Sequence, residues 1–282
     1  MKLFRIRSFD EYMSHSARVA SMLEEHAEFL RLHTPAKREP FTVPGYSYTA
    51  QKQVKFLVDY QHAGESGGVI WRERVCCSET YFNNRMRATF HLFDVEMEPY
   101  PDLDVYITEQ LTPIYKYFKN NYPKTVGSEF LGGAALKGHS RSDGIRNEDL
   151  CDLSFADQSY DAIVSLDVFE HIPSYREAFK ECARVLKSGG GKLMWSVPFI
   201  PSSRTNSIRA KLVDDQIQHI IIPPEYHGDP LSSNGILCFQ HFGWEMLDEM
   251  KLAGFRDAYA VCYQSIPFGY LGGEQFMFFA VK

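Results

Sequence analysis

One acidic side chain stands where an open α/β sheet presents groups to a ligand. Glu129 comes just after Lys124–Gly127, a short stretch that predicts a strand. It also lies twenty residues after Glu109, which directly follows another predicted strand, Leu103–Thr108. Ligands of such sheets bind outside the carboxyl ends of the strands. Glu129 therefore suits a carboxylate that accepts both hydroxyl groups of a ribose, the alternative being a solvated acid in a turn.

Two histidines are candidate general bases, because an imidazole titrates near neutral pH. His227 lies in the loop 223–230, which has proline residues at both ends and a glycine next to the histidine. Core packing explains such a loop histidine poorly, so we expect His227 to act on a bound acceptor. For His171, packing at the start of a helix is an equal alternative. Tyr226 and Trp244 could wall an aromatic or sugar-like acceptor, or be ordinary core residues.

The elements that must position these residues alternate between strand and helix from Leu103 onward, as in parallel sheets built from βαβ units. Thr112 followed by Pro113 predicts one helix start, and Ser174 with Glu177 has capping-box spacing for another. The predicted strands are Leu103–Thr108, Lys124–Gly127, Gly144–Asn147, Asp161–Leu166, Lys192–Val197, Ala258–Tyr263 and Gln275–Val281. We therefore predict a doubly wound α/β fold with a seven-stranded, mostly parallel sheet at residues 101–282.

Residues 1–100 predict a smaller N-terminal α+β lobe. Asp10–His33 has helical spacing, Phe41–Trp71 reads as short strands, and Asn83–Asp94 is helical again. The acidic, proline-containing segment Glu96–Asp104 predicts the connector. We expect this lobe to act as a lid over the acceptor.

Composition excludes several classes of protein. A net charge of −6 and a pI near 5.9 disfavour a general affinity for nucleic acid. No apolar run has the length of a membrane span, and the N-terminus has no signal-like apolar region. The six cysteines form no disulfide framework, which is typical of a reducing compartment. A cytoplasmic protein with a small-molecule or protein acceptor is therefore expected.

The segment 147–199 resembles the class I S-adenosylmethionine (SAM) dependent methyltransferases, in particular the type 11 group. The matching text is Asp149–Phe155, Ser159–Asp161, Asp167–Ile172 and Ala183–Gly190. The resemblance implies a Rossmann-like methyltransferase fold with SAM as its cofactor. It also implies that Asp149 and the N–H of Leu150 hold the adenine edge, and that Leu166 and Asp167 line the methionine side.

The sequence departs from this family after the first strand, where the family has a glycine-rich turn. Residues 107–113 read Ile-Thr-Glu-Gln-Leu-Thr-Pro and contain no glycine. Without glycine the backbone cannot approach the methionine part as closely. We therefore expect the side chains of Glu109, Gln110 and Thr112 to contact its ammonium and carboxylate groups.

A second resemblance concerns the zinc-knuckle segment that precedes some methyltransferase domains, where two Cys-x-x-Cys pairs bind zinc. It rests on Gly45–Ala50, Trp71–Glu73, Cys77–Thr80 and the following residues 83–85. Ser47, Ala50 and Thr80 stand at three of the four cysteine positions, so only Cys77 remains. One thiolate cannot hold a structural zinc, and we predict a metal-free remnant and no other metal site.

The leading hypothesis is a SAM-dependent methyltransferase that acts on an oxygen of a small molecule, with nitrogen as the alternative nucleophile. Methyl transfer from a sulfonium is an in-line displacement, so a base is needed only when the acceptor arrives protonated. A non-catalytic binding or scaffold protein of the same fold is the other class, prompted by the missing glycines. A protein or RNA methyltransferase is a third, with RNA disfavoured by the acidic balance. Nothing in the sequence fixes the oligomeric state.

Overall fold

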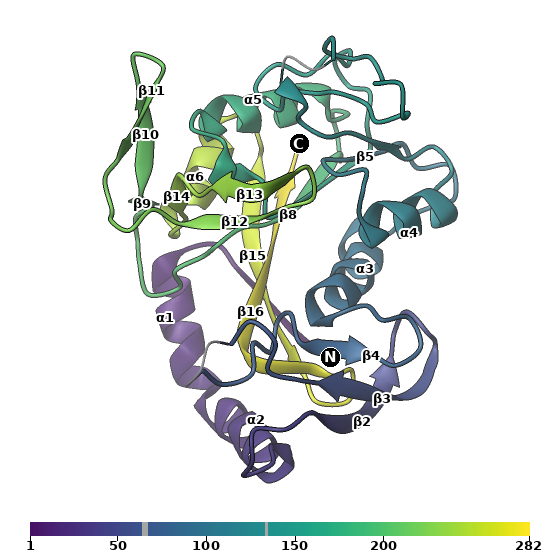
Figure 1. Ribbon diagram of the computed structural model, residues 1–282, viewed down its shortest axis with the longest axis vertical. Helices are drawn as coiled ribbons and strands as arrows, with labels where there is room; N and C mark the ends of the chain where they lie inside the picture. Colours follow the sequence, from purple (N-terminus) through teal and green to yellow (C-terminus); the bar gives the residue numbers. More distant parts are fainter. Residues whose placement is uncertain (64–66, 133–134) are drawn as a thin grey trace. The chain divides into compact units, whose positions relative to one another are not determined.

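The structure is a computed structural model that describes residues 1–63, 67–132 and 135–282. Its central feature is a seven-stranded sheet of order β1-β15-β16-β8-β7-β5-β6 (Figure 1). The strands β6, β5, β7 and β8 run parallel to one another, whereas β16 pairs with β8, and β1 with β15, in the antiparallel sense. The bounds of the strands are β1 (Lys2–Ile6), β5 (Val105–Ile107), β6 (Val126–Gly127), β7 (Ala162–Leu166), β8 (Lys192–Ser196), β15 (Asp257–Ser265) and β16 (Tyr270–Val281). The expected α/β fold with a seven-stranded sheet is confirmed.

Helices alternate with the parallel strands and also fill the N-terminal part of the chain. Their bounds are α1 (Phe9–Arg18), α2 (Ala20–His33), α3 (Asn84–Met97), α4 (Pro113–Asn121), α5 (Tyr175–Val185), α6 (Glu245–Leu252) and the 3₁₀ helix η2 (Phe169–His171). The start of α4 is as predicted, because the Thr112 hydroxyl accepts the Tyr115 N–H at 3.2 Å and Pro113 occupies the first turn. None of the helices in the described ranges is long and apolar enough to cross a membrane.

The capping box predicted at the start of α5 is wrong. Ser174 precedes the helix, but its side chain makes no capping hydrogen bond. Its backbone (φ −98°, ψ 41°) is not in the extended region from which an N-cap side chain reaches back to the helix. The Glu177 carboxylate instead accepts from Lys180 Nζ at 2.8 Å.

The chain divides into two compact units. Unit 1 comprises Met1–Ile6, Asp10–Pro99 and Ala260–Met277, and unit 2 comprises Arg7–Phe9, Tyr100–Tyr259 and Phe278–Lys282. One change of unit, at residues 99–100, falls in the segment read as a connector. Beyond the N-terminal residues, unit 1 also takes in the turn between β15 and β16 with parts of both strands.

Unit 1 contains an antiparallel three-stranded sheet of β2 (Phe41–Ser47), β3 (Lys52–Val58) and β4 (Val75–Cys77). The buried face of β3 follows the alternation of its sequence, with every second residue inward. Its core joins this face to the β16 residue Leu271.

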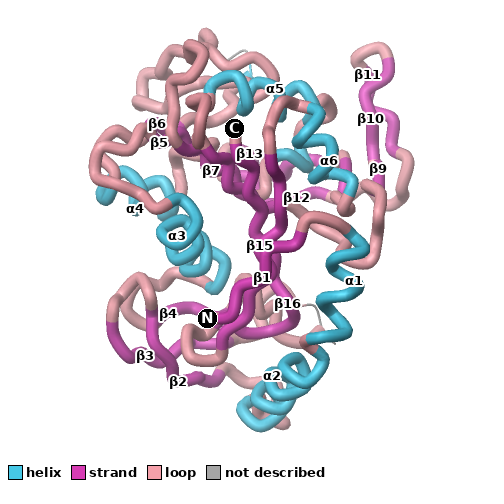
Figure 2. Tube along the Cα trace, turned by 180° about the vertical axis from the view of Figure 1, so that it is seen from behind, coloured by secondary structure: helices cyan, strands magenta, loops and turns pink. Residues whose placement is uncertain are grey.

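Unit 2 carries an insertion after β8 that is built from three short ladders. The ladders pair β9 (Ser207–Ile208) with β14 (Gln240–His241), β10 (Ala210–Val213) with β11 (Gln216–His219), and β12 (Tyr226–Asp229) with β13 (Ser232–Leu237). The β10–β11 hairpin projects away from the rest of unit 2 in both views (Figures 1 and 2). The β12 strand carries His227, so the insertion supplies one of the predicted site residues.

The membership of the seven-stranded sheet differs from the prediction at one strand. Gly144–Asn147 forms two isolated bridges and no strand: a parallel one between Asn147 and Glu129, and an antiparallel one between Arg146 and Ser140. The Arg146 N–H is donated to the side-chain oxygen of Gln110 at 2.8 Å rather than to a neighbouring strand, and Gly144 has a φ of +84°. The seventh strand is β1, near the N-terminus, where we predicted no strand.

Candidate active site

The acidic residues singled out in the sequence gather at one edge of the parallel strands of unit 2. The parallel register places Ile107, the last residue of β5, beside Gly127 of β6 and Val164 of β7. The residues that follow these strands, including Glu129 and Asp167, therefore leave the sheet at the same carboxyl edge. This is the edge at which open α/β sheets bind ligands.

Glu129 is held against the loop that follows β5. Its Oε1 accepts the backbone N–H groups of Gln110 at 2.7 Å and of Leu111 at 2.9 Å. Burial raises the pKa of Glu129, the two N–H bonds oppose that shift, and the negative charge of Asp229 adds to it. Neither bond involves the second carboxylate oxygen. Glu129 is therefore fixed in place with one oxygen still able to accept a hydroxyl, and it fits the ribose-binding role.

The other polar side chains of this loop have structural partners. The Gln110 amide donates to the Gly144 carbonyl at 3.0 Å, its oxygen accepts the Arg146 N–H, and the Thr112 hydroxyl caps α4. Contacts from Gln110 or Thr112 to a cofactor would have to compete with these bonds. Glu109 is half-buried in the same loop.

The loop after β5 packs closely against Gly127 of the neighbouring strand β6, where only a glycine fits. A Cβ at Gly127 would stand 2.8 Å from the Glu109 carbonyl oxygen and 2.5 Å from the Tyr115 ring. The loop after β5 thus comes close to the backbone of β6 without any glycine of its own.

The two remaining cofactor candidates with carboxylates are anchored by short local bonds. Asp149 Oδ1 accepts the Cys151 N–H at 2.8 Å, as in an Asx turn, beside the buried Leu150. Asp167 follows the buried Leu166, has a φ of +54°, and accepts the Ser196 hydroxyl at 2.7 Å. The left-handed backbone at Asp167 is the kind of local strain that marks functional turns.

The two candidate bases lie on either side of a third residue, Glu170. Glu170 and His171 belong to η2, and His227 to β12. The Glu170 Oε1 is 3.7 Å from His171 Nε2 and 3.6 Å from His227 Nδ1, and the two imidazole rings are 4.9 Å apart. The Phe239 N–H donates to the Glu170 carbonyl at 2.7 Å, which fastens the insertion to η2. The topology thus assembles a His-Glu-His cluster from two segments that are 56 residues apart in sequence.

Neighbouring groups fix the outward nitrogen of each ring. His171 Nδ1 lies 2.8 Å from the Leu237 carbonyl, which can only accept, so this nitrogen carries the proton. His227 Nε2 lies 2.8 Å from Glu225 Oε1. The inward nitrogens, Nε2 of His171 and Nδ1 of His227, are therefore the ones that face Glu170.

The electrostatics of the cluster are uneven. Burial raises the pKa of Glu170 to about 7 and lowers the pKa of His171. Contacts with Cys238, Glu170 and Glu225 raise the pKa of His227 to about 11. His171 thus stays neutral near pH 7, as a general base must.

Of the two aromatic candidates, only one is exposed. Tyr226 precedes His227 on β12 and is 54% exposed, so a bound molecule can reach it. Trp244 is 3% exposed, its indole N–H donates to the Pro201 carbonyl at 2.8 Å, and its ring packs against Phe199. Trp244 therefore has the surroundings of a core residue.

Two carboxylates of this site were not singled out from the sequence. Glu170 belongs to the segment Asp167–Ile172 that resembles the methyltransferase family, and Glu225 belongs to the loop around His227, but neither was assigned a role. The available signal was the pairing of each acid with a histidine, as Glu170-His171 and Glu225-x-His227.

In unit 1, the knuckle-like positions lie together. Burial raises the pKa of Cys77, but hydrogen bonds with Ser47 and Thr80 outweigh that effect and hold it below its usual value. The Ala50 N–H donates to the Ser47 hydroxyl at 3.3 Å. Hydroxyl groups thus satisfy the remaining thiol, and the metal-free state of this segment stays a prediction.

Comparisons with known proteins agree with the resemblance drawn from the sequence. Residues 113–194, which run from α4 into β8, match the family model of the methyltransferase domain. No curated protein matches the chain. The family match shows a SAM-dependent methyltransferase domain in this chain, and SAM is the cofactor of that domain.

Solved structures with a similar arrangement share little sequence with this chain. A chain of the complex between the Haloferax volcanii Trm112 methyltransferase activator and a methyltransferase is 14% identical, with a TM-score of 0.42 over 70% of this chain and 90% of that one. A SAM-dependent methyltransferase from Mesorhizobium loti is 13% identical, with a TM-score of 0.38 over 70% and 96%. One from Methanosarcina mazei is 15% identical, with a TM-score of 0.36 over 68% and 94%.

Proposed function

We propose that this chain transfers the methyl group of SAM to an oxygen of a small-molecule acceptor, at the carboxyl edge of β7. The observation that carries the proposal is the His171-Glu170-His227 cluster. Its Glu170 and His171 follow β7, shortly after the cofactor candidate Asp167, and β12 adds His227. Bound SAM supplies an electrophilic methyl group on sulfonium sulfur. The protein has to align an acceptor with it and to remove the acceptor's proton.

The cofactor is assigned to the acidic residues along the same edge. Glu129 would accept the ribose hydroxyls through the oxygen that its loop bonds leave unused. Asp149 with the Leu150 N–H would hold the adenine edge, and Glu109, Leu166 and Asp167 would border the methionine part.

Oxygen is favoured over nitrogen because the cluster offers a base. A hydroxyl stays protonated near neutral pH and gains from a neighbouring imidazole, whereas methylation of an amine mainly needs the neutral amine to be aligned. His171, which stays neutral, is the group placed to serve as the base, and the partly exposed His227 lies on the other side of Glu170. The exposed ring of Tyr226 would contact the acceptor.

One observation favours the second candidate function, a non-catalytic binding protein. The glycine-free loop is folded onto Glu129 and bonded to its carboxylate, so it must yield space when SAM binds. Isothermal titration of the full chain with SAM separates the two. Binding at micromolar to submillimolar cofactor supports the enzyme, and no binding at millimolar cofactor supports the scaffold.

The acceptor class is testable with SAM that carries a labelled methyl group. The full chain is incubated with labelled SAM and small hydroxylated compounds, and separately with small amines, and the products are identified by mass spectrometry. Label on oxygen supports the proposal. Label confined to nitrogen, or to the protein and RNA fractions of an extract, contradicts it.

A further inference from the structure

The Glu170-His171-His227 cluster consists of residue types that bind metal ions. Its three ligand atoms lie within 4.8 Å of one another. Two imidazoles and one carboxylate form the protein ligand set of several catalytic zinc sites, which keep a further position open. The sequence alone predicts no metal site. From the structure we propose that Glu170 Oε1, His171 Nε2 and His227 Nδ1 bind a divalent transition-metal ion, for which Zn²⁺ is the probe.

The distances fit ligands of one ion better than they fit partners of one another. Separations of 3.6 and 3.7 Å between carboxylate oxygen and imidazole nitrogen are too long for hydrogen bonds. Metal–ligand bonds of about 2.0–2.2 Å at tetrahedral angles put neighbouring ligand atoms about 3.3–3.6 Å apart. Both separations between the carboxylate oxygen and an imidazole nitrogen are close to this range.

The carboxylate of Glu170 is the second observation that points to a ligand. Its side chain is fully buried, and neither of its oxygens has a hydrogen-bond partner within the ranges that the structure describes. A buried carboxylate in that condition is costly unless a cation or a proton compensates it. It faces two imidazole nitrogens, which marks the space between the three groups as the place of the compensating charge.

The surroundings have the form of an outer shell around a metal site. Metal-binding histidines usually donate their other ring N–H to a carbonyl or a carboxylate, which fixes the ring and its tautomer. His171 does so toward the Leu237 carbonyl and His227 toward Glu225. Glu225 is in turn held by Arg209, at 3.2 Å, and by His241, at 3.1 Å.

The role assigned to the ion rests on the proposed function. An acceptor hydroxyl bound at the open position would lose its proton to solvent more readily, because a bound cation lowers the pKa of a coordinated oxygen. That oxygen then forms a bond to the methyl carbon, the bond from carbon to sulfur breaks, and its electron pair stays on sulfur. The products are the methylated acceptor and S-adenosylhomocysteine.

The test measures Zn²⁺ binding by the full chain. Purified protein is stripped with chelator and titrated with zinc chloride against a chromophoric chelator, and bound metal is quantified by elemental analysis. The wild type is expected to bind about one ion per chain. Glu170→Gln and His227→Gln should lose this binding, and Glu225→Gln, an outer-shell change, should weaken it by about ten- to a hundred-fold.

Two matched controls address other sources of binding. His15→Gln changes a residue that lies with Cys262 and Glu274 in a second group of metal-binding residue types, in unit 1. Cys77→Ser removes the last thiol of the knuckle-like segment. Both variants should bind Zn²⁺ like the wild type. His227 is partly exposed on the insertion, so His227→Gln removes a ligand without disturbing the core should Glu170→Gln fail to fold. Circular dichroism of each variant reports folding.

The outcomes separate this site from the proposed function. No zinc bound at micromolar concentration, equal binding by wild type and His227→Gln, or loss of binding in Cys77→Ser would overturn the site. SAM titrations on the same samples are independent of it. A chain that binds Zn²⁺ through these residues but transfers no methyl group would retain the metal site and refute the function.

Discussion

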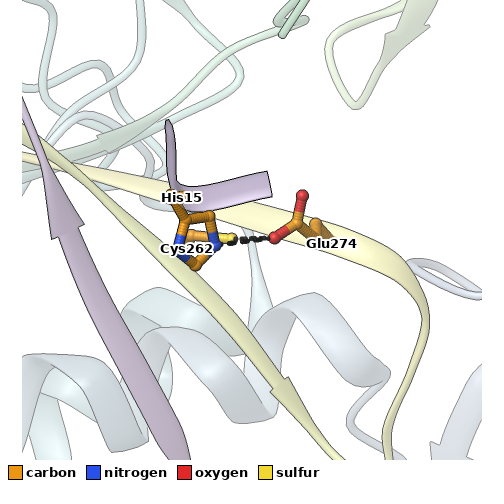
Figure 3. Close-up of side chains that lie close together, drawn as sticks. All are labelled: His15, Cys262 and Glu274. Atoms are coloured by element: carbon orange, nitrogen blue, oxygen red, sulfur yellow. Dashed lines mark hydrogen bonds and ion pairs between the residues drawn. The ribbon is translucent and has the colours of Figure 1, made fainter. Parts of the chain in front are cut away.

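Of the three groups of metal-binding residue types among the described residues, one lies in unit 1 and two lie in unit 2, where Glu225, Cys238 and His241 adjoin the Glu170-His171-His227 cluster. The unit 1 group and the Glu170 cluster are built differently. In unit 1, His15, Cys262 and Glu274 meet at a buried point, with both His15 and Cys262 directed at the Glu274 carboxylate (Figure 3). His15 Nε2 is 2.9 Å and Cys262 Sγ is 3.1 Å from Glu274 Oε1. The Tyr12 hydroxyl donates to the other oxygen, at 3.2 Å. Every oxygen of this carboxylate therefore has a hydrogen bond.

The Glu170-His171-His227 cluster of unit 2 has a second histidine in place of the cysteine, and its bonds also differ. Glu170 stands 3.6–3.7 Å from its two histidines, beyond hydrogen-bond length, while the other ring nitrogen of each histidine is bonded elsewhere. The difference teaches that residue type and burial alone do not identify a site. A cluster whose members hydrogen-bond to one another is structural, whereas a cluster whose members converge beyond hydrogen-bond distance is available to bind a ligand.

The largest expected difference between the clusters is in catalysis. His227→Ala should lower turnover by about a hundred- to ten-thousand-fold, because it removes a group proposed to act on the acceptor, and should leave SAM affinity nearly unchanged. His15→Ala should keep most of the activity. Steady-state kinetics with an identified acceptor measures both variants.

Other outcomes for His227→Ala would revise its role. An increase in the Michaelis constant alone would make His227 a positioning residue. Loss of cofactor binding alone would show that the loop 225–229 contacts the cofactor and not the acceptor. An unaltered turnover number together with an unaltered Michaelis constant would show that His227 does not belong to the site.

The next effect concerns Glu129, the carboxylate proposed to bind the ribose of the cofactor. Glu129→Ala should weaken SAM binding by about ten- to a hundred-fold, because a charge-assisted hydrogen bond contributes about 1.5–3 kcal/mol. Glu177→Ala, which removes a surface acid of the same unit, should leave the dissociation constant unchanged. Isothermal titration measures both, and wild-type affinity in Glu129→Ala would argue against its role.

Stability should respond in unit 1. His15→Ala leaves Glu274 without one of its buried partners, which should lower the free energy of unfolding by about 1–3 kcal/mol. His33→Ala, at an exposed histidine, should change it by less than about 0.5 kcal/mol. Urea denaturation compares the two, and equal stabilities would show that the His15 cluster does not hold unit 1 together.

The smallest effect is a pH dependence of that stability. Burial and the neighbouring Glu274 raise the pKa of the Cys262 thiol well above its usual value. Above about pH 8.5 the unfolded chain loses this proton and the folded chain keeps it, so stability falls as pH rises, by up to about 1.4 kcal/mol per pH unit. Cys262→Ala should flatten this slope between about pH 8.5 and 9.5. An unchanged slope would assign the alkaline loss to other groups.

Local signals in the sequence predicted much of the fold. The helix start predicted at Thr112-Pro113 was correct. It depends only on the hydrogen bond of the Thr112 side chain and on the ring of Pro113, and neither needs a partner that is distant in sequence. Gly144–Asn147 was wrong as a strand because the Gln110 side chain, 36 residues away, takes the Arg146 N–H. The strand β1 was missed because its pairing residues, at 260–264, come almost at the other end of the chain.

In the candidate site, too, local features could be predicted from the sequence and contacts between distant segments could not. His171 and His227 could be singled out one at a time, by residue type and loop context. Their convergence on Glu170 could not, because it depends on how the insertion is fastened to η2 through Phe239 and on where each ring places its proton. Spacing in sequence carries no information on either.

The most direct test of the contrast between the two clusters is a crystal of the full chain with Zn²⁺ and S-adenosylhomocysteine, measured at the zinc absorption edge. We expect an anomalous peak about 2.0–2.2 Å from Glu170 Oε1, His171 Nε2 and His227 Nδ1, with the cofactor product bound along the edge that holds Glu129 and Asp167. A peak at His15 and Cys262 instead, or bound product with no ion beside Glu170, would contradict the account.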